Sequence, residues 1–154
     1  MTQPTQTRRA IESDLSRLVE LEQQAFSGDR LSPRRIKHWI SASNGRLWVA
    51  CAGNQVVGYC LMIWRKNGRG WRLYSLAVDK SARGRGIGKL LIRTAIADAT
   101  GAGAQSMSLE VSVMNASAIE LYASFGFSQV DRRRRYYDNG DDAWVMRLEL
   151  SPCL

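Results

Sequence analysis

The residues Arg83-Gly84-Arg85-Gly86-Ile87-Gly88 carry the strongest structural signal in this chain, because they join an apolar strand pattern to an amphipathic helix pattern. Glycines at alternate positions allow a tight turn and a close approach of a ligand to the backbone, since no Cβ stands in the way. The first N–H groups of the following helix point back at this loop, as does the positive end of its dipole. Arg83, Arg85 and Lys89 add formal positive charge. The segment therefore predicts an anion site, and a pyrophosphate suits it best.

Two common phosphate-binding loops do not fit this spacing. A P-loop requires Gly-x-x-x-x-Gly-Lys followed by Ser or Thr, whereas Gly88-Lys89 is followed by Leu90. A dinucleotide fingerprint requires Gly-x-Gly-x-x-Gly, whereas the glycines here stand at 84, 86 and 88. A plain glycine-rich turn between a strand and a helix is the structural alternative.

Composition limits the class of protein. The chain has 154 residues, enough for a hydrophobic core, and we expect a single domain over residues 1–154. Its net charge of +8 is compatible with nucleic acid, a ribosomal surface, an acidic substrate or only a phosphorylated ligand. No apolar run approaches membrane-spanning length and residues 1–9 are polar, so we expect no membrane partner and a cytoplasmic location. The basic run Arg132–Arg135 is either a solvated strand end or a patch that steers phosphates or an acidic partner.

The cysteines do not form a recognisable framework. Cys51, Cys60 and Cys153 are an odd number without a paired motif, and the chain has one histidine, so we expect neither disulfides nor a metal site. Cys51 and Cys60 lie in apolar strand patterns, which predicts small buried side chains rather than catalytic thiols.

Alternating apolar patterns and turn signals predict the strands. Gly53-Asn54 indicates a hairpin turn, Asn67-Gly68 the next turn, and Asn139-Gly140 a loop within a closing antiparallel pair. The predicted strands are Arg8–Ile11, Arg46–Ala52, Gln55–Trp64, Trp71–Val78, Ser106–Val111, Phe127–Arg133 and Ala143–Leu150.

Four amphipathic segments predict helices. Ser13 is a suitable N-cap for the first, which Ser27-Gly28-Asp29 ends, and Ser32-Pro33 opens the second. The other two are Gly88–Thr100, ended by Gly101, and Ala116–Phe125, closed by Gly126. The resulting order, β-α-α-β-β-β-α-β-α-β-β, is a mixed α/β plan.

Two side chains that can carry protons follow the glycine loop. Glu110 alternates with Leu109 and Val111 in its strand, so it points away from the apolar face. Asn115 lies in the next turn, and Tyr122 lies in the helix after it. From the residues alone, Glu110 is either a solvated carboxylate or a base, and Tyr122 either packs on the sheet or donates a proton.

The pattern Arg-x-x-Gly-x-Gly from Arg83 to Gly88 resembles the acetyl-CoA pyrophosphate loop of the GNAT (GCN5-related) N-acetyltransferases. The predicted order of elements coincides with the order in that superfamily, and the loop falls at the same junction. The resemblance implies the GNAT (acyl-CoA N-acyltransferase) fold, an α/β fold with a mixed central sheet flanked by helices.

From about residue 73 to 148 the chain resembles the ribosomal-protein-alanine N-acetyltransferases. The segments that carry this resemblance are Leu76-Ala77-Val78, Leu109-Glu110-Val111, Asn115, Ala118-Ile119-x-Leu121-Tyr122, Gly126-Phe127, Arg133-Arg134-x-Tyr136-Tyr137 and Asp142-Ala143.

This resemblance implies a role for each matching residue. Glu110 would be the general base, directly or through water, and Tyr122 would donate a proton to the departing CoA thiolate. The backbone at 76–78 would pair with the pantetheine arm, residues 84–89 would hold the pyrophosphate, and Asn115 would contact CoA. The implied donor is acetyl-CoA, without a metal, and its binding residues are Leu76, Ala77, Val78, Arg83, Gly84, Arg85, Gly86, Ile87, Gly88, Lys89 and Asn115.

The acceptor is expected to be a primary amine, most simply a peptide or protein N-terminus. An α-amino group has a pKa of about 7.7–8.0 and a lysine about 10.4, so one carboxylate base is enough for the former. The segments Phe26–Arg30 and Ser112–Met114, with Arg135, depart from the family near the acceptor end. A small-molecule amine acetyltransferase is therefore the alternative. A CoA-binding module on a ribosome or RNA is a further one, but no aromatic-basic RNA motif supports it, and a binder needs neither Glu110 nor Tyr122.

Overall fold

Seven strands form one mixed sheet in the computed structural model, which describes residues 4–26, 28 and 30–151. Their order across the sheet is β1-β2-β3-β4-β5-β7-β6, and neighbouring strands are antiparallel except β4 and β5, which are parallel. The strands are β1 (Thr5–Arg9), β2 (Gly45–Ala52), β3 (Gln55–Ile63), β4 (Gly70–Val78), β5 (Ser106–Ser112), β6 (Ser128–Arg133) and β7 (Ala143–Glu149).

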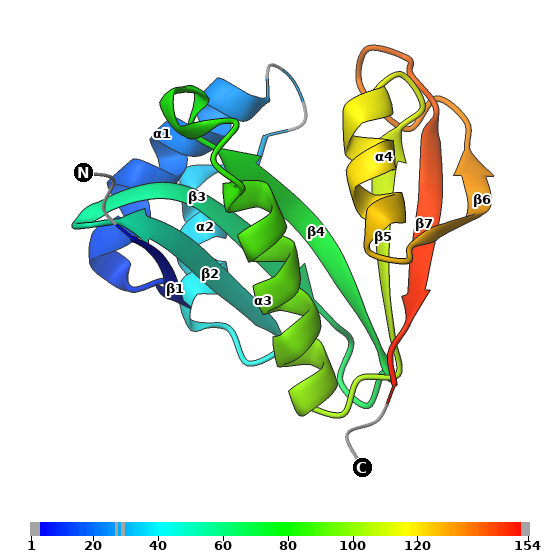
Figure 1. The fold of residues 1–154 in the computed structure, drawn as a ribbon, viewed down its shortest axis with the longest axis horizontal. Coiled ribbons are helices and arrows are strands. Elements are labelled where there is room, and N and C mark those ends of the chain that lie inside the picture. Colours follow the sequence, from blue (N-terminus) through cyan, green and yellow to red (C-terminus); the bar gives the residue numbers. More distant parts are fainter. Residues whose placement is uncertain (1–3, 27, 29, 152–154) are drawn as a thin grey trace.

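Helices cover both faces of this sheet (Figure 1). One apolar core joins α1 and α2 to β2 and β3, and a second joins α3 and α4 to the other face. The expected α/β order is thus confirmed. The helices are α1 (Leu15–Ala25), α2 (Pro33–Ser41), α3 (Ile87–Gly101) and α4 (Ala116–Ser124), with 3-10 turns η1 (Glu12–Asp14) and η2 (Lys80–Ala82). None of the helices in the described part of the chain is long and apolar enough to cross a membrane.

Three local predictions were wrong at their ends. The first strand is Thr5–Arg9 rather than Arg8–Ile11, because it pairs with β2 over that range. Ser13 does not cap α1; it lies inside η1, and the neighbouring Asp14 carboxylate accepts the Ile11 N–H at 2.8 Å. Gly101 is the last residue of α3 rather than the residue that stops it.

The stop signal of α3 is Gly103, which has a φ of 86°. Its N–H donates to the Thr100 carbonyl at 3.1 Å, and the Ala104 N–H donates to the Ala99 carbonyl at 3.0 Å. These two bonds form a Schellman motif, which requires the left-handed residue at this position. The predicted break at Ser27-Gly28-Asp29 involves Ser27 and Asp29, which lie outside the described residues.

The sheet opens between β4 and β5. Their pairing is limited to Gly70 with Ser106, Trp71 with Met107 and Arg72 with Ser108. Beyond these pairs the two strands diverge into a V, with α3 on one arm and α4 on the other (Figure 1). The edge of β4 that faces the gap is therefore free to pair with an extended ligand between Ser75 and Val78.

A β-bulge in β4 decides which side chains face each core. Leu61 of β3 pairs with Ser75, and Met62 pairs with Leu73, so Tyr74 is an extra residue without a partner in the ladder. One extra residue shifts the alternation of side chains by one position. Trp71 and Leu73 therefore share the α3 and α4 face with Leu76 and Val78, whereas Ser75 faces α1.

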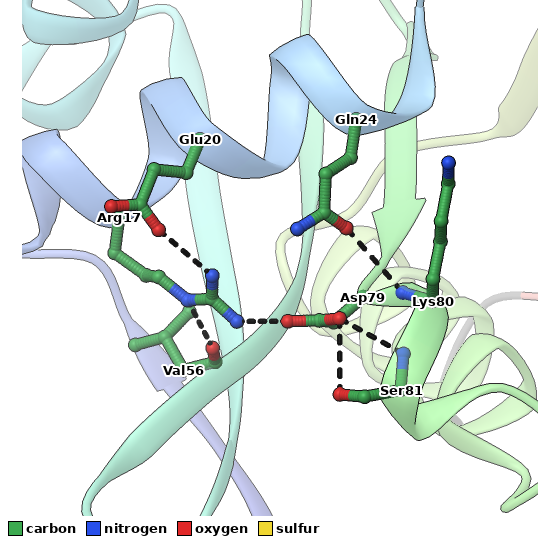
Figure 2. A network of polar contacts seen from close by, with 7 residues as sticks. All are labelled: Arg17, Glu20, Gln24, Val56, Asp79, Lys80 and Ser81. Atoms are coloured by element: carbon green, nitrogen blue, oxygen red, sulfur yellow. Dashed lines mark hydrogen bonds and ion pairs between the residues drawn. The ribbon is translucent and has the colours of Figure 1, made fainter.

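A polar network fixes the segment that leads from β4 into the glycine loop (Figure 2). Arg17 of α1 donates to the Val56 carbonyl at 2.9 Å and forms an ion pair with Asp79. The other Asp79 oxygen accepts the N–H and the hydroxyl of Ser81, both at 3.0 Å. These hydrogen bonds lower the pKa of Asp79, with the Ser81 N–H as the largest cause and Arg17 next.

Candidate active site

A cavity of about 670 Å³ occupies the opening between β4 and β5. It is lined from both faces of the sheet, by α1 and the segment after it on one side and by α4 on the other. Four of the predicted site residues line it, namely Leu76, Glu110, Asn115 and Tyr122. The structure thus brings together residues that are separated by up to 46 positions in the sequence.

Glu110 and Tyr122 approach this cavity from opposite faces. Leu109 and Val111 belong to the core beneath α3 and α4, so the alternation of β5 directs Glu110 to the other face. Tyr122 lies in α4 and packs against that same core. A ligand in the gap can therefore meet the carboxylate on one side of the sheet and the phenol on the other.

The end of α4 positions Tyr122. Gly126, with a φ of 98°, donates to the Ala123 carbonyl at 3.0 Å, and the Phe127 N–H donates to the Tyr122 carbonyl at 3.2 Å. This is again a Schellman motif, and its apolar contact is the edge-to-face pair of Tyr122 and Phe127, whose ring centroids are 5.9 Å apart. Burial raises the pKa of Tyr122 to about 12, so its hydroxyl is protonated at any physiological pH.

The glycine loop opens α3 without any side-chain cap. Gly84 and Gly86 have φ values of 81° and 77°, and a Cβ at either position would have no neighbour within 4 Å. Glycine is thus required there by the left-handed backbone and not by packing within the protein. The first N–H groups of α3 have no partner inside the helix, which is the arrangement that binds a phosphate.

The residues predicted to bind the acetyl donor differ in how far their side chains are exposed. Arg83, Arg85 and Lys89 are exposed, whereas Ile87 is buried and has only its backbone to offer a ligand. Residues 83–89 lie outside the cavity lining. A Cβ at Gly88 would lie 3.8 Å from Leu121 of α4 and 4.0 Å from Val78 of β4, so the loop adjoins both arms of the V.

The other residues predicted to bind the acetyl donor lie on β4 and at the start of α4. The Ala77 side chain is buried in the core beneath α1, so its backbone is what it can offer a ligand. Asn115 caps α4, because its Oδ1 accepts the Ala118 N–H at 3.2 Å. Its amide nitrogen is the part that can contact a ligand.

Glu110 does not stand alone in the cavity. Its Oε2 accepts a hydrogen bond from Nε of Arg72 at 2.9 Å, and Nη2 of Arg72 donates to the Tyr136 hydroxyl at 2.7 Å. The pKa of Tyr136 is raised, first by burial and then by the charge of Glu110. Sequence reasoning missed Arg72, although a charged residue within an apolar strand was a signal, because only the pairing of β4 with β5 places it beside Glu110.

A second carboxylate reaches the cavity from α1. Glu22 is 2% exposed, accepts the Leu31 N–H at 2.7 Å, and forms a hydrogen bond with the Tyr59 hydroxyl, which lies 3.1 Å from the Ser75 hydroxyl. Burial raises the pKa of Glu22 and outweighs the hydrogen bond from Tyr59. Sequence reasoning missed Glu22 as well. Its position one turn after Leu18 on the apolar face of α1 was the available signal.

The cysteines give no sign of reactivity. Cys60 is fully buried, and burial raises the pKa of its thiol to about 12, so it stays protonated. Cys51 is half-buried. The prediction of a buried structural thiol is confirmed for Cys60, and Cys153 lies outside the described residues.

The sequence matches the acetyltransferase (GNAT) family over residues 15–127. A curated relative, N-alpha-acetyltransferase RimI of Mycobacterium tuberculosis, is 33% identical over 152 residues, which cover 96% of this chain and 94% of that protein.

Two solved structures show the same fold. The ribosomal-protein-S18-alanine N-acetyltransferase from Escherichia coli superposes with a TM-score of 0.88 at 24% identity and covers 98% of this chain and 97% of its own. A chain of the NatC complex bound to Gag peptide and CoA superposes with a TM-score of 0.82, also at 24% identity, and covers 96% and 99%. The fold expected from the glycine loop and the order of elements is thus confirmed.

Proposed function

Because the chain belongs to the acetyltransferase (GNAT) family, we propose that it transfers an acetyl group from acetyl-CoA to the N-terminal α-amine of a peptide or protein. The observation that supports this proposal most directly is the cavity through the open sheet, which carries a carboxylate on one side and a phenol on the other. Such a passage lets the donor and the acceptor enter from different directions and meet in the gap.

The donor is proposed to bind along one arm of the V. Its pantetheine would pair with the free edge of β4 at Leu76–Val78, and its pyrophosphate would lie on the N–H groups of residues 84–89. Arg83, Arg85 and Lys89 would contribute charge, and Asn115 its amide nitrogen. No metal is required, because a thioester is already activated towards an amine.

The transfer itself needs two proton movements. The neutral amine attacks the thioester carbon, a C–N bond forms, and the C–S bond breaks. Glu110 takes one proton from the attacking nitrogen, directly or through a water molecule, and Tyr122 gives one to the departing sulfur. The products are the N-acetylated acceptor and CoA, and the two side chains then return to their starting states by exchange with solvent.

Tyr122 can supply this proton because its hydroxyl is protonated. Burial raises the pKa of Tyr122 to about 12, above the value near 8.5 that is ordinary for a thiol. The phenol therefore keeps its proton until the C–S bond breaks and a thiolate forms beside it.

The preference for an α-amine follows from Glu110 as the proposed base. Near neutral pH the neutral form of an α-amine requires under about 1.5 kcal/mol, whereas a lysine requires roughly 4 kcal/mol. A protein that relies on Glu110 alone should therefore prefer the α-amine. An alanine-initiated ribosomal protein is the first acceptor to test, since the solved E. coli relative is described as acting on one.

The experiment is an acetyl-transfer assay over a panel of N-terminal peptides, lysine side chains and small amines, with products identified by mass spectrometry. We expect the peptide α-amine to be acetylated fastest at neutral pH. Transfer to small amines alone would contradict the proposal and favour a small-molecule enzyme. Binding of acetyl-CoA without any transfer would favour a non-catalytic module.

A chelator tests the metal-free mechanism in the same assay. We expect EDTA to leave the rate unchanged. Loss of activity that zinc or magnesium restores would show that the thioester step, as written above, is wrong.

A further inference from the structure

Arg72 is a charged side chain of the cavity that the proposed mechanism does not use. It belongs to the last pair of residues at which β4 and β5 are bonded before they diverge. Its guanidinium donates to Glu110 and to Tyr136, and its Cζ lies 5.0 Å from the centre of the Tyr74 ring. Three elements of the acceptor end therefore hold this group in one place.

The guanidinium keeps donors for a ligand. Arginine has five N–H donors in a rigid fork. Among the described residues, Arg72 forms two hydrogen bonds, one from Nε to Glu110 and one from Nη2 to Tyr136. The Arg72 side chain is 35% exposed and that of Glu110 15%, and both line the cavity. The site thus presents a carboxylate acceptor and the remaining arginine donors next to each other, because the hydrogen bond from Nε to Oε2, 2.9 Å long, holds the two side chains together.

This pair is complementary to the first residue of a peptide. The amine nitrogen and the carbonyl oxygen of an amino-acyl group are separated by three bonds and lie roughly 3 Å apart. The nitrogen carries N–H donors, and the carbonyl oxygen is an acceptor. We propose that the Arg72–Glu110 pair recognises this unit, with Glu110 accepting from the amine while Arg72 donates to the first carbonyl oxygen.

The inference rests on the proposed function and narrows its substrate class. It makes Arg72 a specificity-determining residue that distinguishes a peptide α-amine from an amine without an adjacent carbonyl. A neutral carbonyl suits the site better than a carboxylate, because a full negative charge placed near Arg72 would also lie near Glu110.

The test combines two enzymes with two acceptors. One acceptor is an alanine-initiated peptide, and the other is the same peptide with an E-alkene in place of its first amide. The enzymes are wild type and Arg72→Met. We expect the substitution to lower kcat/KM for the peptide by about 10- to 100-fold more than for the alkene, the range for a charged hydrogen bond. The two acceptors also differ in the basicity of their amines. That difference affects both enzymes equally, so it cancels when the ratio of the two rates is compared between wild type and variant.

Two further variants make the result specific. Arg132→Met removes an arginine with similar contacts, an ion pair to Asp142 and a ring contact 5.0 Å from Trp144, but Arg132 does not line the cavity. Arg132→Met should leave the preference for the peptide over the alkene unchanged. Arg72→Lys keeps the charge without the fork and should retain part of the preference. If Arg72→Met does not fold, Arg72→Lys still tests whether Arg72 recognises the peptide.

The outcomes separate the inference from the proposed function. An equal loss with both acceptors would overturn the inference, because Arg72 would then act only by holding Glu110. If wild type acetylates neither acceptor but does acetylate a small amine, the proposed function fails and the inference fails with it.

Discussion

The two ends of the cleft are built from different parts of the polypeptide. The proposed donor end is mainly one continuous segment, from Leu76 to Lys89, which offers mainly backbone groups, and Asn115 adds its amide from the start of α4. The acceptor end is assembled from side chains of α1, β4, β5 and the loop after β6, among them Glu22, Arg72, Glu110 and Tyr136. A backbone site depends on where the chain turns, whereas a side-chain site depends on how strands pair. The two ends should therefore respond differently to substitution.

Tyr122→Phe should give the largest effect on transfer, because it removes the proposed proton donor and keeps the ring that packs on Phe127. We expect kcat to fall by roughly 10- to 10⁴-fold with little change in acetyl-CoA affinity. Because the pKa of Tyr122 is raised to about 12, the wild-type rate should show no alkaline loss due to this residue below about pH 10. A wild-type rate for the variant, with chemistry rate-limiting, would make Tyr122 a packing residue.

Gly86→Asp should come next and should act on the donor alone. The substitution places a side chain and a negative charge where a phosphate would bind, and we expect acetyl-CoA affinity to fall by about 100-fold in calorimetry. The control is Gly103→Asp at the other end of α3, where φ is 86° and a Cβ would also meet no atom within 4 Å. Both variants carry the same backbone strain. If the two variants bind acetyl-CoA with equal affinity, the pyrophosphate does not bind at Gly86.

Glu110→Gln should have a smaller effect that depends on the acceptor. An α-amine is already partly neutral at pH 7, so we expect a loss of about 10-fold for a peptide and a larger loss for a lysine-like amine. The variant should regain activity as the pH rises past the pKa of the amine itself. The measurement is a pH–rate profile of both enzymes on one verified acceptor. A deficit that stays constant across that range would argue against a base at this position.

Asp79→Asn should have the smallest effect on the chemistry, since it acts on the scaffold of the donor end. The pKa of Asp79 is lowered in the folded protein, so its stabilisation is present above the ordinary value near 3.9 and is lost as the pH falls below it. We expect the free energy of unfolding to drop by about 1–3 kcal/mol at pH 7 and the deficit to shrink below about pH 4. Urea unfolding at pH 7 and pH 3 measures both.

Glu20→Gln is the matched control for that experiment. Glu20 binds the same Arg17 at 3.0 Å, but its side chain is 62% exposed. Solvent screens such a pair, so the change should stay within about 0.5 kcal/mol. A deficit as large as that of Asp79→Asn would show that the network in Figure 2 stabilises the protein through Arg17 alone.

The sequence could predict the elements because their signals are local. The hairpin at Gly53-Asn54 and the closing pair of strands were predicted correctly, as was the Ser32 cap, whose hydroxyl accepts the Arg35 N–H at 3.2 Å. The Ser13 cap was wrong because Asp14, with its second partner Arg8, outcompetes the neighbouring serine. The assigned roles of Glu110, Tyr122 and the donor residues stay predictions.

What the sequence determined by itself is the glycine loop, proposed above as part of the donor end, and the fold in which it lies. Gly84 and Gly86 have left-handed conformations that lead into α3, and such conformations are properties of single residues. Only the tertiary structure decided the acceptor end. The bulge at Tyr74 shifts every later side chain of β4, and the short pairing with β5 places Arg72 beside Glu110. Strand register is set by contacts between segments distant in sequence, so no local pattern could encode it.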